Sequence, residues 1–170
     1  LAISDCVFEV VVDAQSEEKE WGESGVDRVE FFFSANPGEE TRPLARTASG
    51  GELARVMLAL KTLGSTDAAR KTLVFDEVDV GVGGEAAERI GQRLSRLGKD
   101  FQVLSVTHAP QVAMHGKEHF SVQKEIRAGR TVMAIQRLST LEERAAELSR
   151  LMTGRADSIG VDAAMALLKA

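Results

Sequence analysis

The sequence predicts an α/β fold in which central parallel strands are flanked by helices and accompanied by antiparallel hairpins. Two observations support this prediction. In the middle of the chain, helical and strand patterns alternate at residues 50–63, 71–75, 84–97 and 101–106. This order is typical of a parallel sheet with right-handed crossover connections. Paired strand patterns lie before and after this unit, and they indicate antiparallel hairpins.

The first pair of strands is expected at residues 5–13 (DCVFEVVVD) and 28–34 (RVEFFFS). Both segments are rich in β-branched or aromatic residues, which favour strands. The polar segment 14–27 contains two glycines and is expected to form a turn or loop. Residues 36–38 (NPG) then break the chain, and a polar loop is expected to continue to about residue 48.

Residues 50–63 (GGELARVMLALKTL) give the clearest helical pattern in the chain. The apolar residues of this segment fall on one stripe, at Leu53, Val56, Met57 and Leu60. Ser49 and Glu52 match a capping box, in which the serine oxygen accepts a backbone N–H and the glutamate reaches back to the cap. Gly64 is a natural end for this helix.

Two segments, 71–75 (KTLVF) and 101–106 (FQVLSV), are expected to be buried strands, and polar residues follow each of them. The helix at 84–97 connects them and ends at Gly98. Its inward residues are expected to be Ala87, Ile90, Leu94 and Leu97. Because α/β sheets bind ligands at the carboxyl ends of their strands, the polar residues lie where a site is expected.

The last third of the chain predicts a hairpin and two closing helices. The hairpin strands are expected at 119–127 and 130–138, around Ala128-Gly129, and the helices at 140–153 and 158–169. No strong domain boundary interrupts the chain. We therefore expect the 170 residues to form one domain.

Composition is ordinary for a folded domain, with 44% apolar and 28% charged residues. Residues 1–40 hold eleven acidic and two basic residues, whereas the basic residues of 41–170 are scattered, so composition gives no DNA-binding footprint. Cys6 is the only cysteine, which excludes an internal disulfide and fits a reducing compartment. No apolar run approaches the ~20 residues that span a bilayer. Because the chain begins with Leu1, we expect a piece of a longer protein.

Residues Ser49-Gly50-Gly51-Glu52 begin a helix and can bind a phosphate group. The first N–H groups of a helix lack internal partners and carry the positive end of the dipole, and glycines permit close approach. The same residues can also be a capped helix with a flexible lead-in. The P-loop pattern G-x-x-x-x-G-K-[ST] is absent, so this chain does not supply the main phosphate cradle.

Asp76 and Glu77 end an apolar strand, where one carboxylate can orient a magnesium ion and the other a water molecule. They can also be solvated acids at a strand end. Residues 78–84 (VDVGVGG) indicate a tight turn, being too apolar for an ordinary surface loop. His108 follows the next strand and can donate a hydrogen bond to a phosphate oxygen, or it can be purely structural. No role is assigned to His115 or His119.

These motifs together resemble those of ABC-type ATPases. Residues 49–52 look like the signature motif, 72–77 (TLVFDE) like a Walker B strand with its catalytic glutamate, and 107–108 like the switch histidine. The longer strings resemble the RecN family of bacterial SMC-like proteins of double-strand break repair. They are 36–38 (NPG), 48–55 (ASGGELAR), 75–84 (FDEVDVGVGG) and 107–113 (THAPQVA). The resemblance covers roughly residues 1–155.

The RecN resemblance implies the C-terminal lobe of an ABC/SMC-type P-loop ATPase head, extending over residues 1–170. An N-terminal lobe with Walker A and a coiled coil would lie elsewhere in the protein, and two heads would enclose two ATP molecules. The resemblance further implies action on DNA, at ends or single-stranded regions. It also implies that the protein has no membrane partner and lies in the bacterial cytoplasm, associated with the nucleoid.

Family resemblance also implies the roles of individual residues. Glu77 would orient the attacking water, His108 would contact the γ-phosphate, and Asp76 would position Mg²⁺ through water. The residues that touch ATP of the opposite head would be the signature-motif residues Ser49, Gly50, Gly51 and Glu52. Asp79 and the glycines after it would form the D-loop across the dimer interface. Gly83 departs from the aspartate that commonly ends this loop, which leaves its contacts open.

Two other interpretations fit parts of the sequence. One is the head of another SMC-type or Rad50-like ATPase, against which the string Asp79–Gly84 (DVGVGG) argues. The other is a non-catalytic scaffold that binds only a partner lobe or DNA, an idea motivated by the missing P-loop and the acidic first 40 residues. Turnover that is indifferent to Glu77 would favour the scaffold.

Overall fold

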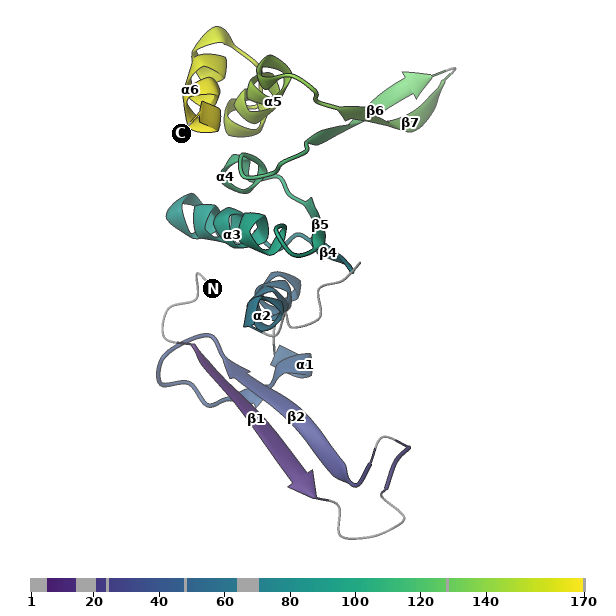
Figure 1. The fold of residues 1–170 in the computed structure, drawn as a ribbon, viewed down its shortest axis with the longest axis vertical. Coiled ribbons are helices and arrows are strands. Elements are labelled where there is room, and N and C mark those ends of the chain that lie inside the picture. The colour runs from purple at the N-terminus through teal and green to yellow at the C-terminus, as the bar shows by residue number, and fades with distance from the viewer. Residues whose placement is uncertain are drawn as a thin grey trace.

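The computed structural model describes residues 6–14, 21–23, 25–47, 49–63, 71–127 and 129–169. Ala48, Gly64 and Ala128, which took part in the sequence predictions, lie outside the described residues. The chain forms three small sheets and six helices within these ranges. The elements follow one another along the long axis of the molecule, from the β1–β2 pair at the bottom to α5 and α6 at the top (Figure 1). The predicted α/β class is confirmed.

Strands β1 (Val7–Ala14) and β2 (Asp27–Ser34) pair antiparallel, as predicted. One face of this pair is apolar, because the register places Phe8 opposite Phe33 and Val10 opposite Phe31. The Phe33 end is buried against the first helices, whereas Val10 is 53% exposed. Only one end of the apolar face is therefore covered within the described residues.

The polar loop expected up to residue 48 is partly wrong. Residues in this region form strand β3 (Arg42–Pro43), which pairs with β2, and the one-turn helix α1 (Leu44–Thr47). The reason is Leu44, which is 7% exposed and packs in one cluster with Phe33 and Val56. A single apolar residue in a polar stretch was enough to anchor the segment.

Helix α2 (Gly50–Leu63) has the predicted capping box. The Glu52 N–H donates to Ser49 Oγ at 3.3 Å, and the Ser49 N–H donates to a Glu52 carboxylate oxygen at 2.9 Å. The buried side of α2 differs from the predicted stripe, because Leu58 is 1% exposed while Leu53 and Met57 are 40% and 41% exposed. Half of the apolar stripe is thus left partly exposed by the described residues.

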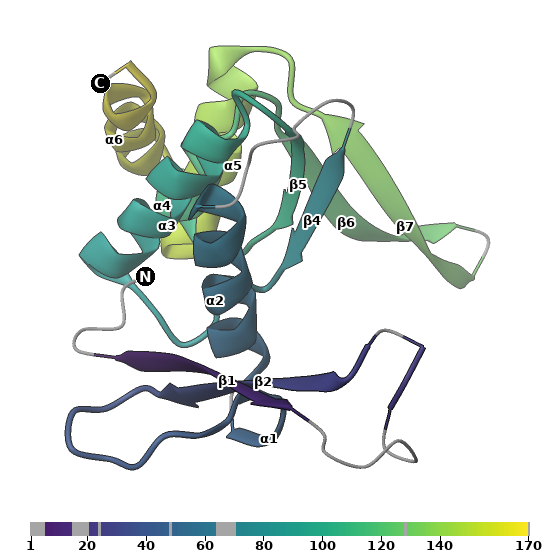
Figure 2. The same ribbon diagram turned by 60° about the horizontal axis from the view of Figure 1, so that its bottom comes forward.

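Strands β4 (Thr72–Asp76) and β5 (Gln102–Val106) form the predicted parallel pair, with α3 (Gly84–Leu97) as the crossover. The four residues predicted to face inward on α3 are all buried. The central core joins α2, β4, α3 and the short helix α4 (Pro110–Ala113), through Leu58, Phe75, Val78, Ile90 and Val112. Figure 2 shows α2 and α3 on one side of β4 and β5.

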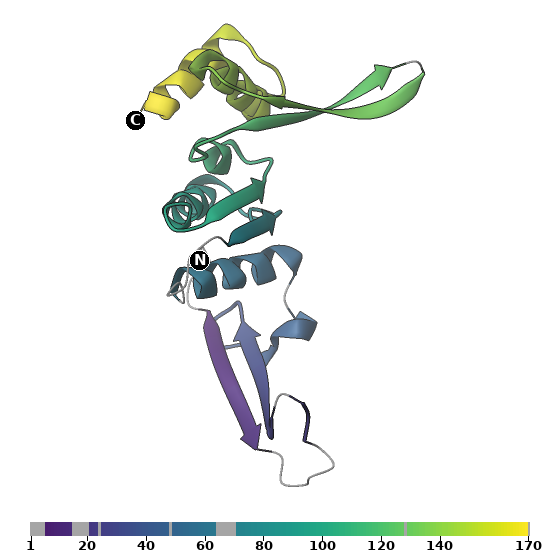
Figure 3. The same cartoon turned by 45° about the vertical axis from the view of Figure 1, so that its right-hand side comes forward.

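The hairpin β6 (Phe120–Arg127) and β7 (Arg130–Arg137) matches the prediction and projects from the body (Figure 3). Helices α5 (Leu141–Thr153) and α6 (Ser158–Lys169) also match it and pack through Ala145, Leu148 and Ala164. Gly160 lets α6 approach α5, because a Cβ there would clash with Ser149 Oγ. Among the described helices, none is both long and apolar enough to cross a membrane.

Candidate functional site

The candidate site begins where β4 ends, at Asp76 and Glu77. Both residues are exposed. Glu77 has a φ of 53°, which places a non-glycine residue in the left-handed region at a cost of about 1–3 kcal/mol. Its N–H donates to the Val106 carbonyl at 3.3 Å, so the turn is fixed to the end of β5. The chain therefore holds the Glu77 backbone in a strained conformation at the edge where a ligand is expected.

The loop after Glu77 is the tight turn predicted from its composition. The Val80 N–H donates to the Glu77 carbonyl at 3.1 Å, and the Val82 N–H donates to the Asp79 carbonyl at 3.2 Å. Gly81 has a φ of 76°, a conformation that glycine adopts without strain. Val78 has no exposed surface, and it anchors the loop in the central core.

Asp79 lies inside the molecule, with 1% of its surface exposed. Its Oδ2 accepts a hydrogen bond from Thr107 Oγ1 at 2.5 Å and another from the Ala109 N–H at 3.2 Å. Its Oδ1 is buried and has no hydrogen-bond partner among the described residues. The carboxylate therefore joins the loop after β4 to the turn after β5, across 28 residues of sequence.

His108 sits on that second turn, and its side chain is 76% exposed. Its Nδ1 lies 4.0 Å from Asp79 Oδ2, a spacing longer than a hydrogen bond. The structure thus brings together the segments that carry Asp76, Glu77 and His108, at the carboxyl ends of β4 and β5. Asp79 belongs to the same edge but faces inward.

The start of α2 presents the second part of the candidate site. Ser49 and Gly50 are exposed, and no atom lies within 4 Å of a Cβ built on Gly50. Gly51 is buried, and a Cβ there would lie 3.0 Å from the Val80 carbonyl oxygen. The helix start and the Glu77–Gly81 loop are therefore in contact, and a side chain at position 51 would push them apart. The carboxylate of Glu52 serves the capping box in this structure.

Arg55 is a residue that the sequence reasoning missed. It is 6% exposed, and its Nη1 donates to the Val80 carbonyl at 3.0 Å and to the Val78 carbonyl at 3.4 Å. Burial lowers the pKa of Arg55, and the negative charge of Glu52 acts in the opposite direction. A charged residue on the buried side of a helix was the available signal, since such a residue needs a partner inside the protein.

A groove of about 320 Å³ runs between α2 and β4 and connects the two parts of the site. Gly50 and Asp76 lie in its wall, and most of the remaining wall is apolar, including Leu53, Met57 and Val74. These apolar residues of α2 and β4 are exposed among the described residues. The groove therefore offers an apolar contact surface beside the polar residues of the site.

The site suits a magnesium nucleotide only as part of a larger assembly. An exposed carboxylate at a strand end fits Mg²⁺, which binds through one or two carboxylates together with waters and phosphates. In the described part of the chain, no group of three or more His, Cys, Asp or Glu residues could hold a metal ion. Asp76 would thus need ligands from the nucleotide and from water.

Curated relatives of this chain are DNA repair proteins named RecN. It is 50% identical to the protein from Mycobacterium leprae over 137 residues, which is 81% of this chain and 23% of that protein. It is 46% identical to the Deinococcus radiodurans protein over 144 residues, and 41% identical to the Halalkalibacterium halodurans protein over 148 residues. The chain spans about a quarter of the length of these relatives. No family model matches the chain.

Solved structures with a similar fold are Smc head domains. The head domain with a coiled coil and joint from Pyrococcus yayanosii aligns with a TM-score of 0.58 and 17% identity, covering 89% of this chain and 27% of that one. The head domain with an extended coiled coil from Pyrococcus furiosus, bound to the C-terminal domain of ScpA, aligns with a TM-score of 0.52 and 16% identity. It covers 81% of this chain and 32% of that one.

Proposed function

We propose that this chain is the C-terminal lobe of an ATPase head. The premise is that four fifths of the chain match RecN proteins and that its fold matches part of an Smc head. In this proposal, ATP binding joins two heads and hydrolysis separates them during DNA double-strand break repair. The single observation that carries the proposal is the Asp79 carboxylate, which fixes the Glu77 loop and the His108 turn at one edge.

Each exposed residue of that edge has a role that its chemistry permits. Glu77 accepts a hydrogen bond from the attacking water and orients it, and Asp76 holds Mg²⁺ through water. His108 donates to the γ-phosphate. The magnesium ion, when bound, offsets the charge that develops on the phosphate oxygens. Asp79 positions these residues from inside the molecule, because it is 1% exposed and its Oδ2 accepts hydrogen bonds from Thr107 and Ala109.

The start of α2 serves the nucleotide of the opposite head. Its exposed residues Ser49 and Gly50 leave room for a phosphate, and the free N–H groups of the first turn attract negative charge. Glu52 contributes by holding the Ser49 backbone in place. Each ATP site of the dimer is thus assembled from two copies of this lobe.

A second lobe supplies the phosphate cradle that this chain lacks. The outer face of the β4–β5 pair is apolar and uncovered, with Val74, Leu104 and Val106 exposed by 67%, 51% and 60%. The groove beside α2 continues this surface. The matched part of the chain is only 23% of the Mycobacterium leprae protein, so the rest of such a protein can provide a Walker A-bearing lobe that covers this face.

We extend the proposal to DNA and to the cell compartment, because the relatives are named as DNA repair proteins. RecN proteins are DNA repair proteins. We expect the complete protein to act at DNA ends or single-stranded regions, in the bacterial cytoplasm and on the nucleoid. The basic residues of 41–170 are scattered along the sequence, and we expect regions outside this chain to contribute to the DNA contact.

Substitution of Glu77 by glutamine tests the proposal in the complete head. The variant keeps the size of the side chain but cannot orient water as a carboxylate does, so we expect ATP binding to persist while turnover falls by at least about 100-fold. ATP-bound dimers should accumulate and be visible by analytical ultracentrifugation. A Glu77→Gln protein that hydrolyses ATP at the wild-type rate would support a scaffold instead.

A further inference from the structure

Arg55 makes the contact that connects the helix start to the Glu77 loop by hydrogen bonds. Its guanidinium leaves α2 in the second turn and reaches the carbonyls of Val78 and Val80. Arg55 thus donates to both of these carbonyls from outside the loop. The loop backbone is thus held by a side chain that belongs to the helix carrying Ser49 and Gly50.

The loop segment whose carbonyls accept from Arg55 is hydrogen-bonded to Glu77. The Val80 N–H closes a turn onto the Glu77 carbonyl at 3.1 Å, so a shift of Val80 displaces the residue with the strained backbone. The backbone of Gly51, at the helix start, lies so near the same carbonyl that a Cβ at this position would be 3.0 Å from the Val80 oxygen. Any movement of the first turn of α2 is therefore transmitted to the Glu77 turn through a hydrogen bond and a close packing contact.

We propose that Arg55 is a positioning residue that couples the nucleotide engaged by the start of α2 to the catalytic geometry of Glu77. The inference rests on the proposed function, in which the α2 start touches ATP of the opposite head while Glu77 acts on ATP of its own head. Arg55 then links the two ATP sites of the dimer. Without it, a head can engage ATP but does not align Glu77 for hydrolysis.

The buried guanidinium of Arg55 is well suited to hold the loop. A guanidinium presents several N–H donors in a planar fork, so it can hold two carbonyls of one loop at a fixed spacing. The Nε of Arg55 is buried without a partner among the described residues, so the side chain is held by its contacts to the loop and by packing. A methionine would fill much of the same space without donating to the loop.

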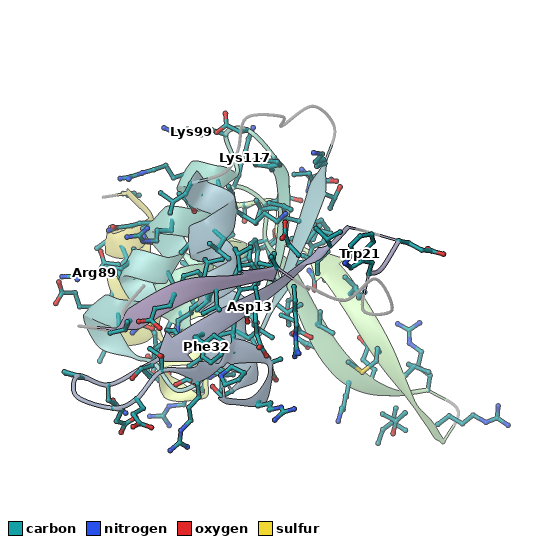
Figure 4. All side chains as sticks on the ribbon, turned by 90° about the horizontal axis from the view of Figure 1, so that it is seen from below. Asp13, Trp21, Phe32, Arg89, Lys99 and Lys117 are labelled. Atoms are coloured by element: carbon teal, nitrogen blue, oxygen red, sulfur yellow. The ribbon has the colours of Figure 1, made fainter. Side chains whose placement is uncertain are left out.

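The test compares Arg55→Met and Arg55→Lys with Arg89→Met in the complete head. Arg89 is a matched control, since it lies on α3, pairs with Glu85 at 2.6 Å and points away from the body (Figure 4). We expect Arg55→Met to lower ATP turnover by about 10- to 100-fold, the size of a misplaced catalytic group. Arg55→Lys should recover part of the rate, and Arg89→Met should match the wild type.

The lifetime of the ATP-bound dimer separates coupling from a structural defect. If Arg55 aligns Glu77, Arg55→Met still forms dimers with ATP, and these persist at least about tenfold longer because hydrolysis is slow. A merely damaged fold would form fewer dimers with shorter lifetimes. Wild-type turnover in Arg55→Met, or a shortened dimer lifetime, would overturn the inference. If Arg55→Met does not fold, an Arg55→Lys protein with wild-type turnover overturns it.

The Glu77→Gln protein, measured in parallel, tells the two proposals apart. Loss of turnover in Glu77→Gln with normal turnover in Arg55→Met would reject only the coupling. Normal turnover in Glu77→Gln would reject the proposed ATPase function itself.

Discussion

The centre of the molecule and its two hairpins place their apolar residues in opposite environments. Around the Glu77 loop, residues from four elements are at most 9% exposed and form one core. On the β6–β7 hairpin, one face carries five apolar side chains that are 53–80% exposed: Phe120, Val122, Ile126, Met133 and Ile135. Within the described residues, the chain therefore packs the surroundings of the Glu77 loop by itself and leaves apolar side chains of its flanking hairpins exposed.

This difference shows how the work is divided in the proposed head. The geometry that must be accurate, between Asp79, Thr107 and Glu77, depends only on contacts within this chain. The surfaces that would join a Walker A lobe carry exposed apolar side chains among the described residues. Substitutions in the two regions should consequently have different effects, on stability in the centre and on association in the hairpins.

The largest effect on stability is expected in the central core. Leu58→Ala should lower the free energy of unfolding by about 2–5 kcal/mol, because Leu58 is 1% exposed and its removal leaves a cavity. Ile126→Ala, at the 80% exposed hairpin position, should change it by no more than about 0.5 kcal/mol. Urea unfolding of the chain by itself measures both. Equal losses would show that the hairpin is packed as well as the core.

The next effect is expected at the buried carboxylate. Thr107→Val removes the hydroxyl that donates to Asp79 and should cost about 1.5–3 kcal/mol, the range for a hydrogen bond to a charged group. Thr131→Val, on the exposed side of β7, is the matched control and should be nearly neutral. Thermal melts of the two variants compare them. A Thr107→Val protein as stable as the control would mean that Asp79 finds another donor.

A smaller effect is expected in self-association of the isolated chain. The exposed apolar face of the hairpin should drive association, and Ile135→Lys should raise the dissociation constant about tenfold, or about 1.4 kcal/mol. Gln136→Lys adds the same charge on the opposite face of β7 and should change little. Sedimentation equilibrium measures both constants. A chain that is monomeric at all concentrations would contradict the assignment of this face as an uncovered contact surface.

The smallest effect is a pH dependence at the base of the hairpin. Burial, and then the positive charge of Arg144, lower the pKa of His119, against a raising contribution from Glu147. The unfolded chain therefore binds more protons below about pH 6.5. Stability should be full above that pH and should fall as the pH drops towards the folded-state pKa. His119→Gln should flatten this part of a stability–pH curve, and an unchanged slope would assign it to other groups.

A second group acts at lower pH in the same region. The hydrogen bond from Arg150 is the main cause that lowers the pKa of Glu147, partly opposed by burial. Its contribution is present above the unfolded pKa of about 4.3 and is lost as the pH falls through the lower folded pKa. The two groups can be distinguished because their pH windows differ.

The sequence predicted the positions of helices and strands well where a local residue pattern determines them. Strand alternation and helical periodicity located β4, β5 and α3 almost to the residue, and the spacing of Ser49 and Glu52 identified the capping box. The motif strings also pointed to the carboxyl edge of the β4–β5 pair. These features depend on neighbours within a few residues, so the local sequence contains the necessary information.

Features that depend on distant partners were missed. Arg55 meets carbonyls 23 and 25 residues away, and Asp79 meets a hydroxyl 28 residues away, so no local pattern reveals either link. Periodicity also placed Leu53 and Met57 on an apolar stripe, without showing that both stay 40–41% exposed in the described part of the chain. Asp79 is 1% exposed in this chain, and the roles that the family resemblance implies for it, at the dimer interface and towards ATP, stay predictions.

The most direct test of the account is ATP turnover by this chain joined to its Walker A-bearing partner lobe, with each lobe alone and the joined Glu77→Gln protein as controls. We predict turnover only in the joined wild-type head, because the catalytic edge and the phosphate cradle lie on different lobes. Absence of turnover in the joined head, or turnover that does not depend on Glu77, would contradict the account.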